Sequence, residues 1–344
     1  MTNFIELEST ISKLATRGKG ILAADESTPT ITKRFEAVGI ESTEENRRIY
    51  RELLVTTPNC NQFIAGVILY EETLNQKTSN GVPFPEALKS LGILPGIKVD
   101  KGLVPLANAG TDQITQGLDG LRERLIEYKS KGACFAKWRA VYAISNTTPC
   151  ELAIETNAEV LARYAAICQE QGIVPIVEPE VLIDGDHTLA RCEEVSSPVL
   201  HAVFDALVRH KVKLEYIVLK PSMVINGKAC AQKASVKEVA EATIRVLKSA
   251  VPATVPTINF LSGGQTSEQA TAHLNAMNQL GNLPWNLSFS YARALQDTCM
   301  KTWAGVAKNI PAAQAAFLKR AKLNGLAAVG DYAENMEKQE VHAA

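Results

Sequence analysis

The chain has few cysteines and histidines, and their spacing argues against a metal centre. The seven cysteines are scattered, and none belongs to a C-x-x-C pair. That usage is typical of reduced thiols in a cytosolic protein rather than of a disulfide framework or a structural zinc site. The five histidines include no pair at i, i+4 and no H-E-x-x-H, so a metal site would need ligands from distant positions. We therefore expect no metal cofactor.

An excess of basic charge and long apolar runs are also missing. Lys plus Arg is 36 and Asp plus Glu is 37, so no positive excess is available to neutralise a nucleic-acid backbone. The longest interval without these charged residues, residues 269–292, is interrupted by four asparagines and a proline, which hydrocarbon would not accept. Residues 1–10 contain no basic residue and no apolar core, so neither a secretory signal nor a transit segment is expected. We predict a cytoplasmic protein without nucleic-acid or membrane partners.

What the chain does contain is an alternation of short apolar runs with longer amphipathic segments. A hydrophobic content of 46% and a charged content of 21% are typical of an ordered, globular chain. The apolar runs, often rich in β-branched residues, predict strands at residues 20–24, 63–69, 96–99, 133–138, 173–177, 216–219, 257–261 and 287–290. Amphipathic periodicity predicts helices between them, for example at residues 44–54, 118–130, 151–171, 188–209, 236–250 and 267–280.

Repeated strand-then-helix units indicate an α/β protein with a closed (β/α)8 barrel, the TIM-barrel fold. The competing arrangement is an open Rossmann-type sheet, but no G-x-G-x-x-G follows the first strand. Extra helices are expected before the first strand, at residues 4–15, and after the last, at 294–303 and 311–323. We expect one domain over residues 1–330. Residues 331–344 are small, polar and charged, which predicts a flexible C-terminal tail.

Ionisable side chains recur where the predicted strands end. The C-terminal strand ends of such a barrel meet at one mouth, so these groups are expected to converge there. In chain order they are Asp25, Lys98, Asp100, Lys137, Arg139, Glu178, Glu180, Lys220 and Arg293. One such group alone is usually a solvated strand end or a structural ion pair. Their convergence on one mouth favours a catalytic site over surface charge.

Lys220 is the strongest candidate for a nucleophile. It follows the apolar run at residues 216–219, which would carry its stem into a partly desolvated site. Desolvation and neighbouring cations favour the free amine of a lysine, and a free amine can attack a carbonyl. The alternative is an ordinary lysine at a loop start before Pro221. Lys98 and Lys137, expected at the same mouth, favour the catalytic interpretation.

Glu178 and Glu180 lie two residues apart at the edge of a predicted strand, so both are expected on the same side of it. A carboxylate pair beside a reactive amine can move protons while a carbinolamine forms and loses water. The alternative is that the pair only forms salt bridges to Lys137 and Lys220, and the two roles are compatible.

The segment Ser262-Gly263-Gly264-Gln265, which precedes a predicted helix, is typical of a phosphate-binding turn. Glycines let backbone N–H groups approach an oxyanion, and a helix start adds the positive end of a dipole. This turn follows the seventh predicted strand and Arg293 follows the eighth, where many barrels bind phosphate. Cations for a second anionic group of the substrate are available in Lys33, Arg34, Lys98 and Arg139.

Seven short motifs together are similar to those of a known family. They are GILAADEST at 20–28, EENRR at 44–48, GIKVDKG at 96–102, FAKWR at 135–139, PIVEPE at 175–180, LKP at 219–221 and LSGGQ at 261–265. In combination they resemble class I fructose-1,6-bisphosphate aldolase from about residue 5 to residue 330. The resemblance implies a lyase of glycolysis and gluconeogenesis that reversibly cleaves fructose 1,6-bisphosphate into dihydroxyacetone phosphate and glyceraldehyde 3-phosphate. It also implies a lysine Schiff base, no metal or other cofactor, and a homotetramer.

The resemblance assigns catalytic roles to individual residues. Lys220 matches the Schiff-base lysine, whose iminium would accept electrons when the C3–C4 bond breaks. Glu178 matches the acid and base of imine formation, and Asp25 matches the group that orients and deprotonates the C4 hydroxyl. Glu180 and Lys137 match residues that support charge and position.

The resemblance also assigns residues to the two phosphates of the substrate. The phosphate on C1 would be held by Ser262, Gly263 and Arg293. The phosphate on C6 would be held by Ser27, Lys98 and Arg139, with Lys33 and Arg34 nearby. Binding energy from both phosphates could then be used to orient the scissile bond between them.

Three features depart from the family pattern. Ala292 replaces a usual glycine, and alanine would be strained there if the backbone required a positive φ. Pro29 also replaces a usual glycine, which is expected to stiffen a loop and remove an N–H donor. Many animal members end in a tyrosine that helps protonate the enamine, whereas this sequence ends in Ala344 and its last tyrosine is Tyr332. We assign no such role to Tyr332.

Two other functions stay open at this point. A Schiff-base lyase with the same barrel could act on another phosphorylated sugar, such as sedoheptulose 1,7-bisphosphate, or in a transaldolase-like reaction. A non-catalytic scaffold could also keep the barrel, but it would be expected to have lost the lysine or a glutamate, and Lys220, Glu178 and Glu180 are all present.

Overall fold

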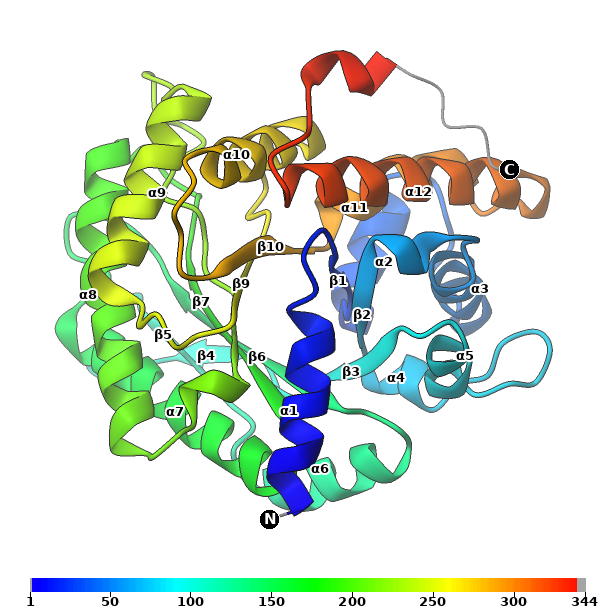
Figure 1. Cartoon of the computed structure of the whole chain (residues 1–344), viewed down its shortest axis with the longest axis horizontal. Helices are drawn as coiled ribbons and strands as arrows, with labels where there is room; N and C mark the ends of the chain where they lie inside the picture. The colour runs from blue at the N-terminus through cyan, green and yellow to red at the C-terminus, as the bar shows by residue number, and fades with distance from the viewer. Residues whose placement is uncertain (1, 339–344) are drawn as a thin grey trace.

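The computed structural model describes residues 2–338, and within that range eight parallel strands close into a barrel (Figure 1). The barrel strands are β1 (Gly20–Ala24), β2 (Ile64–Leu69), β3 (Leu94–Lys98), β6 (Phe135–Tyr142), β7 (Val174–Val181), β8 (Val218–Leu219), β9 (Thr257–Phe260) and β10 (Asn286–Tyr291). Going round the barrel, their order is β1-β10-β9-β8-β7-β6-β3-β2. The predicted (β/α)8 fold is confirmed.

Helices surround the barrel, except that the first helix packs against the core inside it (Figure 1). They are α1 (Thr2–Leu14), α2 (Thr28–Glu36), α3 (Glu44–Val55), α4 (Glu71–Leu74), α5 (Phe84–Ser90), α6 (Leu121–Ser130), α7 (Glu151–Glu170), α8 (Leu189–Arg209), α9 (Val236–Ala250), α10 (Ser267–Gln279), α11 (Arg293–Trp303) and α12 (Ile310–Ala327). Of the helices in the described part of the chain, none is both long and apolar enough to cross a membrane.

Side chains on the two faces of the strands fill two separate cores. Outward-facing residues such as Leu22 and Val67 pack against the surrounding helices. Inward-facing residues such as Ile21 pack inside the barrel, together with Leu7 and Leu14 of α1. Burial of such a leucine contributes about 1.5–3 kcal/mol. Helix α1 therefore plugs the lumen with apolar side chains, which leaves the opposite, C-terminal strand ends for polar groups.

Close packing in the outer core, between the strands and the helices, explains a glycine in β1. A Cβ atom on Gly20 would lie 2.5 Å from the ring of Phe289 in β10, which no real side chain could tolerate. Phe289 is fully buried. The glycine lets an aromatic ring fill the space that a side chain on β1 would otherwise occupy.

The observed elements differ from the predicted ones where polar residues enter the sheet. Strands β6 and β7 each extend four residues beyond their predicted ends, so Arg139, Glu178 and Glu180 lie inside strands and not after them. Strand β8 has only the residues Val218–Leu219, because Leu214–Tyr216 form a 3-10 turn before it. An antiparallel hairpin of β4 (Leu103–Pro105) and β5 (Gln113–Thr115) was not predicted.

The first part of the predicted C-terminal tail contacts two of the helices. Residues 331–338 pack onto α10 and α12: Tyr332 is buried, and its N–H donates to Oδ1 of Asn275 at 3.0 Å. Arg320 on α12 forms two contacts with the Glu337 carboxylate, at 2.7 and 2.6 Å. The domain boundary at residue 330 stays a prediction, and the part of the predicted tail at 339–344 lies outside the described residues.

Candidate active site

Every residue to which the family resemblance gave a role lines one cavity of about 560 Å³ at the C-terminal strand ends. The residues are Asp25, Ser27, Lys33, Arg34, Lys98, Lys137, Arg139, Glu178, Glu180, Lys220, Ser262, Gly263 and Arg293. They come from elements far apart in the chain, and closure of the barrel brings them together.

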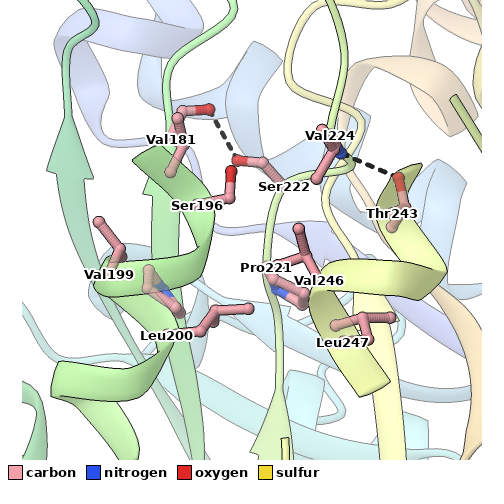
Figure 2. Close-up of a pocket in the computed structure, with 11 residues that line it drawn as sticks. Val181, Ser196, Val199, Leu200, Pro221, Ser222, Val224, Thr243, Val246 and Leu247 are labelled. Carbon is pink, nitrogen blue, oxygen red and sulfur yellow. Dashed lines mark hydrogen bonds between the residues drawn. The ribbon is translucent and has the colours of Figure 1, made fainter. Parts of the chain in front are cut away.

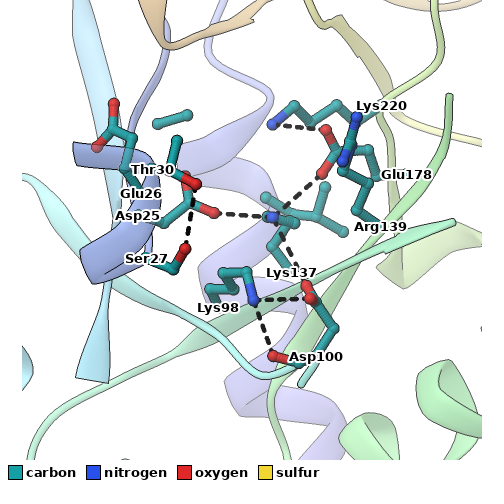
Figure 3. Close-up of polar contacts among 12 residues, drawn as sticks. Asp25, Glu26, Ser27, Thr30, Lys98, Asp100, Lys137, Arg139, Glu178 and Lys220 are labelled. Atoms are coloured by element: carbon teal, nitrogen blue, oxygen red, sulfur yellow. Dashed lines mark hydrogen bonds and ion pairs between the residues drawn. The ribbon is translucent and has the colours of Figure 1, made fainter. Parts of the chain in front are cut away.

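Lys137 lies at the centre of the charged groups in this cavity (Figure 3). Its Nζ is 2.8 Å from Oδ2 of Asp25, 3.5 Å from Oε2 of Glu178 and 3.7 Å from Oδ2 of Asp100. Burial disfavours the charged amine, but the three carboxylates outweigh it and raise the pKa of Lys137. Lys137 is therefore held as a cation.

Asp25 is the carboxylate nearest to Lys137. Burial opposes its charged form, but Lys137, Lys220 and Lys98 outweigh that effect and hold the pKa of Asp25 well below its ordinary value. A carboxylate in this state is ionised and can accept a hydrogen bond from a hydroxyl group. Asp25 and Lys137 thus form a buried ion pair whose two charges depend on one another.

Lys220 lies directly after β8, and its side chain is 4% exposed. Its Nζ is 3.2 Å from Oε1 of Glu178, whose other oxygen faces Lys137 (Figure 3). The backbone N–H of Lys220 donates to the carbonyl of Val177 at 2.8 Å, which continues the ladder between β7 and β8. The sheet therefore fixes a buried amine against one carboxylate oxygen.

A small, mostly apolar cavity lies outside β7 and β8, where α8 and α9 pack against them (Figure 2). Pro221, which follows Lys220, lines this cavity together with Leu200 of α8 and Leu247 of α9. Nearby, Oγ of Ser222 donates to the carbonyl of Val181 at 2.8 Å. The cavity has a volume of about 10 Å³, which leaves room for about one water molecule. It is therefore too small to be a second binding site, and the residues around it pack behind Lys220.

Glu180 has a different partner from Glu178. It forms an ion pair with Nε of Arg139 on the neighbouring strand, and the two residues lie on the same side of the sheet as Glu178. Burial opposes the charge of Arg139, but Glu180, with Glu178 and Asp100, raises its pKa. Glu178 therefore forms the salt bridges to Lys137 and Lys220 that the alternative interpretation expected of both glutamates. Glu180 does not, because it pairs with Arg139.

Two further cation groups lie at the mouth. Nζ of Lys98, at the end of β3, is 2.6 Å from Oδ1 of Asp100. On α2, Nη1 of Arg34 is 2.5 Å from Oε1 of Glu26, and Lys33 precedes it in the last turn of the helix. An incoming anion would compete with these carboxylates for the cations.

The Ser262-Gly263-Gly264 turn has the backbone conformation that only glycine adopts readily. The φ angles of Gly263 and Gly264 are 57° and 92°. Helix α10 begins after Thr266, whose side chain accepts from the N–H of Gln269 in a capping box. Because that cap already uses one N–H of the helix start, an anion would depend more on the turn and on Arg293, the first residue of α11.

The backbone accommodates both residues that replace a usual glycine of the family, Ala292 and Pro29. Ala292 has a φ of −100°, so the strain expected from a positive φ is absent at this position. Pro29 lies in the first turn of α2, after the N-cap residue Ser27, and not in a loop. Proline fits this position because its φ suits a helix start and its missing N–H would have no helical partner there.

Sequence reasoning missed a buried network behind α2. Glu26 binds Arg34 through one oxygen and Nη2 of Arg51 through the other, at 2.7 Å, while Nε2 of Gln296 donates to Glu26 at 3.0 Å. Glu26 and Arg51 are both nearly inaccessible to solvent. The available signal was an acidic residue next to Asp25, but Arg51 in an amphipathic helix is indistinguishable from a surface arginine in the sequence.

Metal ligands are not clustered within residues 2–338, where no group of three or more His, Cys, Asp or Glu side chains is arranged to hold an ion. Tyr332, the last tyrosine, donates its hydroxyl to Glu337 at 3.0 Å. The fold and the cavity together define the class of protein: a TIM-barrel enzyme whose mouth carries buried lysines, carboxylates and a Gly-Gly turn.

Comparison with known proteins gives the family. The sequence model for fructose-bisphosphate aldolase class-I matches residues 6–344. A probable fructose-bisphosphate aldolase class 1 of Xanthomonas campestris pv. campestris is 57% identical over 328 residues, which cover 95% of this chain and 98% of that protein. The cytosolic fructose-bisphosphate aldolase 4 of Arabidopsis thaliana is 53% identical, over 95% of this chain and 84% of that protein.

A solved structure agrees with these relatives. Fructose-bisphosphate aldolase from Plasmodium falciparum, in complex with TRAP and a small molecule inhibitor, is 48% identical and superposes with a TM-score of 0.95. The match covers 97% of this chain and 96% of that one. The chain belongs to the class-I fructose-bisphosphate aldolase family, and the prediction of a lyase of this family is confirmed.

Proposed function

We propose that the protein reversibly cleaves fructose 1,6-bisphosphate into dihydroxyacetone phosphate and glyceraldehyde 3-phosphate through a Schiff base on Lys220, as a step of glycolysis or gluconeogenesis. The observation that carries the proposal is the buried amine of Lys220, 3.2 Å from Glu178 in a cavity lined by cations. Lys137 is unsuited to attack because three carboxylates hold it as a cation. Lys220 is therefore the nucleophile.

The first stage forms the imine. The free amine of Lys220 attacks the C2 carbonyl, and one proton passes from its nitrogen, through Glu178, to the C2 oxygen, which gives the carbinolamine. Glu178 then takes a second proton from solvent and donates it to the carbinolamine hydroxyl, which leaves as water and gives the iminium. Glu178 is suited to both transfers because one of its oxygens faces Lys220 and the other faces Lys137.

The second stage breaks the C3–C4 bond. Asp25 removes the proton of the C4 hydroxyl, the C4 oxygen becomes an aldehyde, and the bonding electrons move through C3 and C2 to the iminium nitrogen, giving an enamine. Lys137, 2.8 Å from Asp25, keeps that carboxylate ionised and in place before the substrate binds. Protonation of C3 and hydrolysis of the imine release dihydroxyacetone phosphate.

Two sets of residues would bind the phosphates at the ends of the substrate. We propose Ser262, Gly263 and Arg293 for the phosphate on C1. We propose Ser27, Lys98, Arg139, Lys33 and Arg34 for the phosphate on C6. Both sets line the same cavity as Lys220, so contacts at the two ends can orient C2, C3 and C4 for reaction.

Borohydride trapping tests the proposal. The protein is incubated with dihydroxyacetone phosphate in excess EDTA, reduced, digested and analysed by mass spectrometry. We expect one reduced adduct, on Lys220, and activity that resists EDTA. The variant Lys220→Arg should lose the adduct and at least about a thousandfold in kcat, because arginine cannot form the imine. The variant Lys101→Arg, at a half-exposed lysine paired with Glu71, should retain both.

An adduct on Lys137, or activity that EDTA abolishes, would contradict the proposed mechanism. Substrate choice is tested in the same assay by comparing kcat/KM for fructose 1,6-bisphosphate with that for sedoheptulose 1,7-bisphosphate. A higher value for the heptose would favour the alternative lyase, and no turnover of either sugar would favour a scaffold.

We further propose that residues 1–330 form one domain and that the protein is a cytoplasmic homotetramer. The cytoplasmic assignment is supported by the relative from Arabidopsis thaliana, whose name places it in the cytosol. The oligomer rests on the family resemblance, and light scattering coupled to size-exclusion chromatography tests it. A mass near that of the 37.3 kDa chain would contradict it.

A further inference from the structure

The Gly-Gly turn has a second cation beside it that the family resemblance does not assign. A Cβ atom on Gly264 would lie 2.8 Å from Nζ of Lys228 and 3.1 Å from Nη2 of Arg293. Both cations are therefore neighbours of the same face of Gly264. They come from different elements, since Lys228 lies in the loop between β8 and α9 whereas Arg293 begins α11.

The backbone that carries Lys228 is fixed to the neighbouring loop. The N–H of Lys228 donates to the carbonyl of Ile183 at 2.9 Å, and the N–H of Ala229 donates to the carbonyl of Gly185 at 2.8 Å. Nζ of Lys233 donates to the carbonyl of Lys228 at 2.6 Å. These hydrogen bonds fix the backbone at Lys228. The loop after β7 and the loop after β8 therefore place the Lys228 side chain beside Gly264.

Lys228 has a partner that it can readily exchange. Its Nζ is 3.2 Å from Oδ1 of Asp184, and the two side chains are 46% and 71% exposed. An ion pair exposed to this degree is weak, because water screens it and holding the two side chains together costs conformational entropy. A phosphate carries more negative charge than one carboxylate and offers three acceptor oxygens, so the amine would transfer from Asp184 to a phosphate at the turn.

We propose that Lys228 is a further substrate-binding residue, which with Arg293 clamps the phosphate on C1 at the Ser262-Gly263-Gly264 turn. This inference rests on the proposed function and adds a residue to its C1-phosphate site. The amine lies at the phosphate and not at the reacting carbons, so it contributes to binding of the ground state and of the transition state alike. Its loss should therefore change KM and leave kcat nearly unaltered.

The test compares Lys228→Gln with Lys228→Arg and with Lys237→Gln. Lys237 is a matched control because it is an 82% exposed lysine on the following helix, α9. For Lys228→Gln we expect KM for fructose 1,6-bisphosphate, and the inhibition constant of dihydroxyacetone phosphate, to rise about fivefold with kcat within about twofold. Lys228→Arg should restore both constants, and Lys237→Gln should match the wild type.

A second ligand separates lost binding from general damage. Glyceraldehyde 3-phosphate carries the phosphate of the other end, so its inhibition constant should be the same in Lys228→Gln and in the wild type. Unchanged constants for dihydroxyacetone phosphate, or an equal loss for both ligands, would overturn the role of Lys228. A wild-type protein without the borohydride adduct on Lys220 would instead overturn the proposed function, whatever the Lys228 variants show.

Discussion

Charge balance explains how several ionisable side chains share one buried site. Lys137 and Lys220 both contact Glu178, and Lys137 also contacts Asp25 and Asp100. Each charge is stabilised by opposite charges that are themselves buried, so no member can be removed without leaving a neighbour unpaired. The same arrangement keeps Lys137 charged beside Lys220, which is what a site with one reactive amine requires.

The variant Asp25→Asn should destabilise the protein at neutral pH by about 3–5 kcal/mol, because Lys137 loses its nearest carboxylate. The pKa of Asp25 lies below its ordinary value in the folded protein. A lowered folded-state pKa contributes stability above the unfolded-state pKa, and this contribution is lost as the pH falls. The difference in unfolding free energy between the wild type and Asp25→Asn should therefore be constant above about pH 5 and shrink below about pH 4. Urea unfolding at a series of pH values measures it.

Asp297 on α11 provides a control with the opposite sign. Burial raises its pKa, although Arg34 and Arg293 partly oppose that effect. A raised pKa means that ionisation of Asp297 disfavours the folded state, so Asp297→Asn should become relatively more stable as the pH rises through the range where the carboxyl ionises. Parallel pH dependences for the two variants, or a difference for Asp25→Asn that stays constant to pH 3.5, would contradict this account.

At the scale of elements, the sequence pattern predicts those whose hydrophobic periodicity is uninterrupted. Strand β1 and helix α9 have the predicted bounds, because each is apolar on its buried side and ends in a turn signal. The ends of β6 and β7 were wrong because Arg139, Glu178 and Glu180 interrupt the apolar runs. These side chains are polar and yet face the barrel mouth, where Arg139 pairs with Glu180 and Glu178 pairs with Lys220.

The candidate site was largely predictable because the barrel rule needs only the order of strands and the residues at their ends. The contacts within it were not. Glu26 was missed because its partners, Arg51 and Gln296, come from α3 and α11, and nothing in those helices distinguishes a buried polar residue from an exposed one. The β4–β5 hairpin was missed because each of its strands has three residues, too few for a periodicity.

Helix α1 provides a prediction at the element scale. Leu7 is fully buried in the lumen core, whereas Ile5 on the same helix is 68% exposed. Leu7→Ala should lower the free energy of unfolding by about 2–5 kcal/mol, because it removes apolar contacts and leaves a cavity. Ile5→Ala should change it by less than about 0.5 kcal/mol. Urea unfolding measures both.

The activity of Leu7→Ala shows whether α1 only fills the barrel or also positions the active site. Helix α1 fills the barrel at the end opposite the cavity, so kcat of folded Leu7→Ala should equal that of the wild type. A large fall in kcat with little loss of stability would show that α1 positions the site.

At the scale of the whole molecule, the two ends of the barrel have opposite character. One end is closed by apolar side chains of α1, and the other holds the charged cavity. The chain then continues past the last strand through α11 and α12, and residues 331–338 return over α10 and α12. Because α10 follows the Gly-Gly turn directly, this C-terminal segment packs on a helix that begins at the proposed phosphate site.

Glu337 holds the C-terminal segment in place, which gives a prediction for the molecule as a whole. Its carboxylate contacts the buried Arg320 and accepts a hydrogen bond from Tyr332. Glu337→Gln removes the charge opposite Arg320, so we expect residues 331–338 to open locally while the barrel stays folded. Amide hydrogen exchange of this segment should accelerate about tenfold or more, with little change in the thermal midpoint.

Glu334→Gln is the matched control, because Glu334 lies in the same 3-10 turn but is exposed, and it should leave the exchange rate near that of the wild type. If Glu337→Gln lowers the thermal midpoint of the entire protein, the segment is part of the cooperative domain, and the domain extends beyond residue 330. If exchange is unchanged in both variants, burial of Tyr332 and its hydrogen bond to Asn275 hold the segment without Glu337. The three outcomes therefore locate the boundary between the barrel and its C-terminal segment from measured stability, whereas the predicted boundary at residue 330 rests on residue composition.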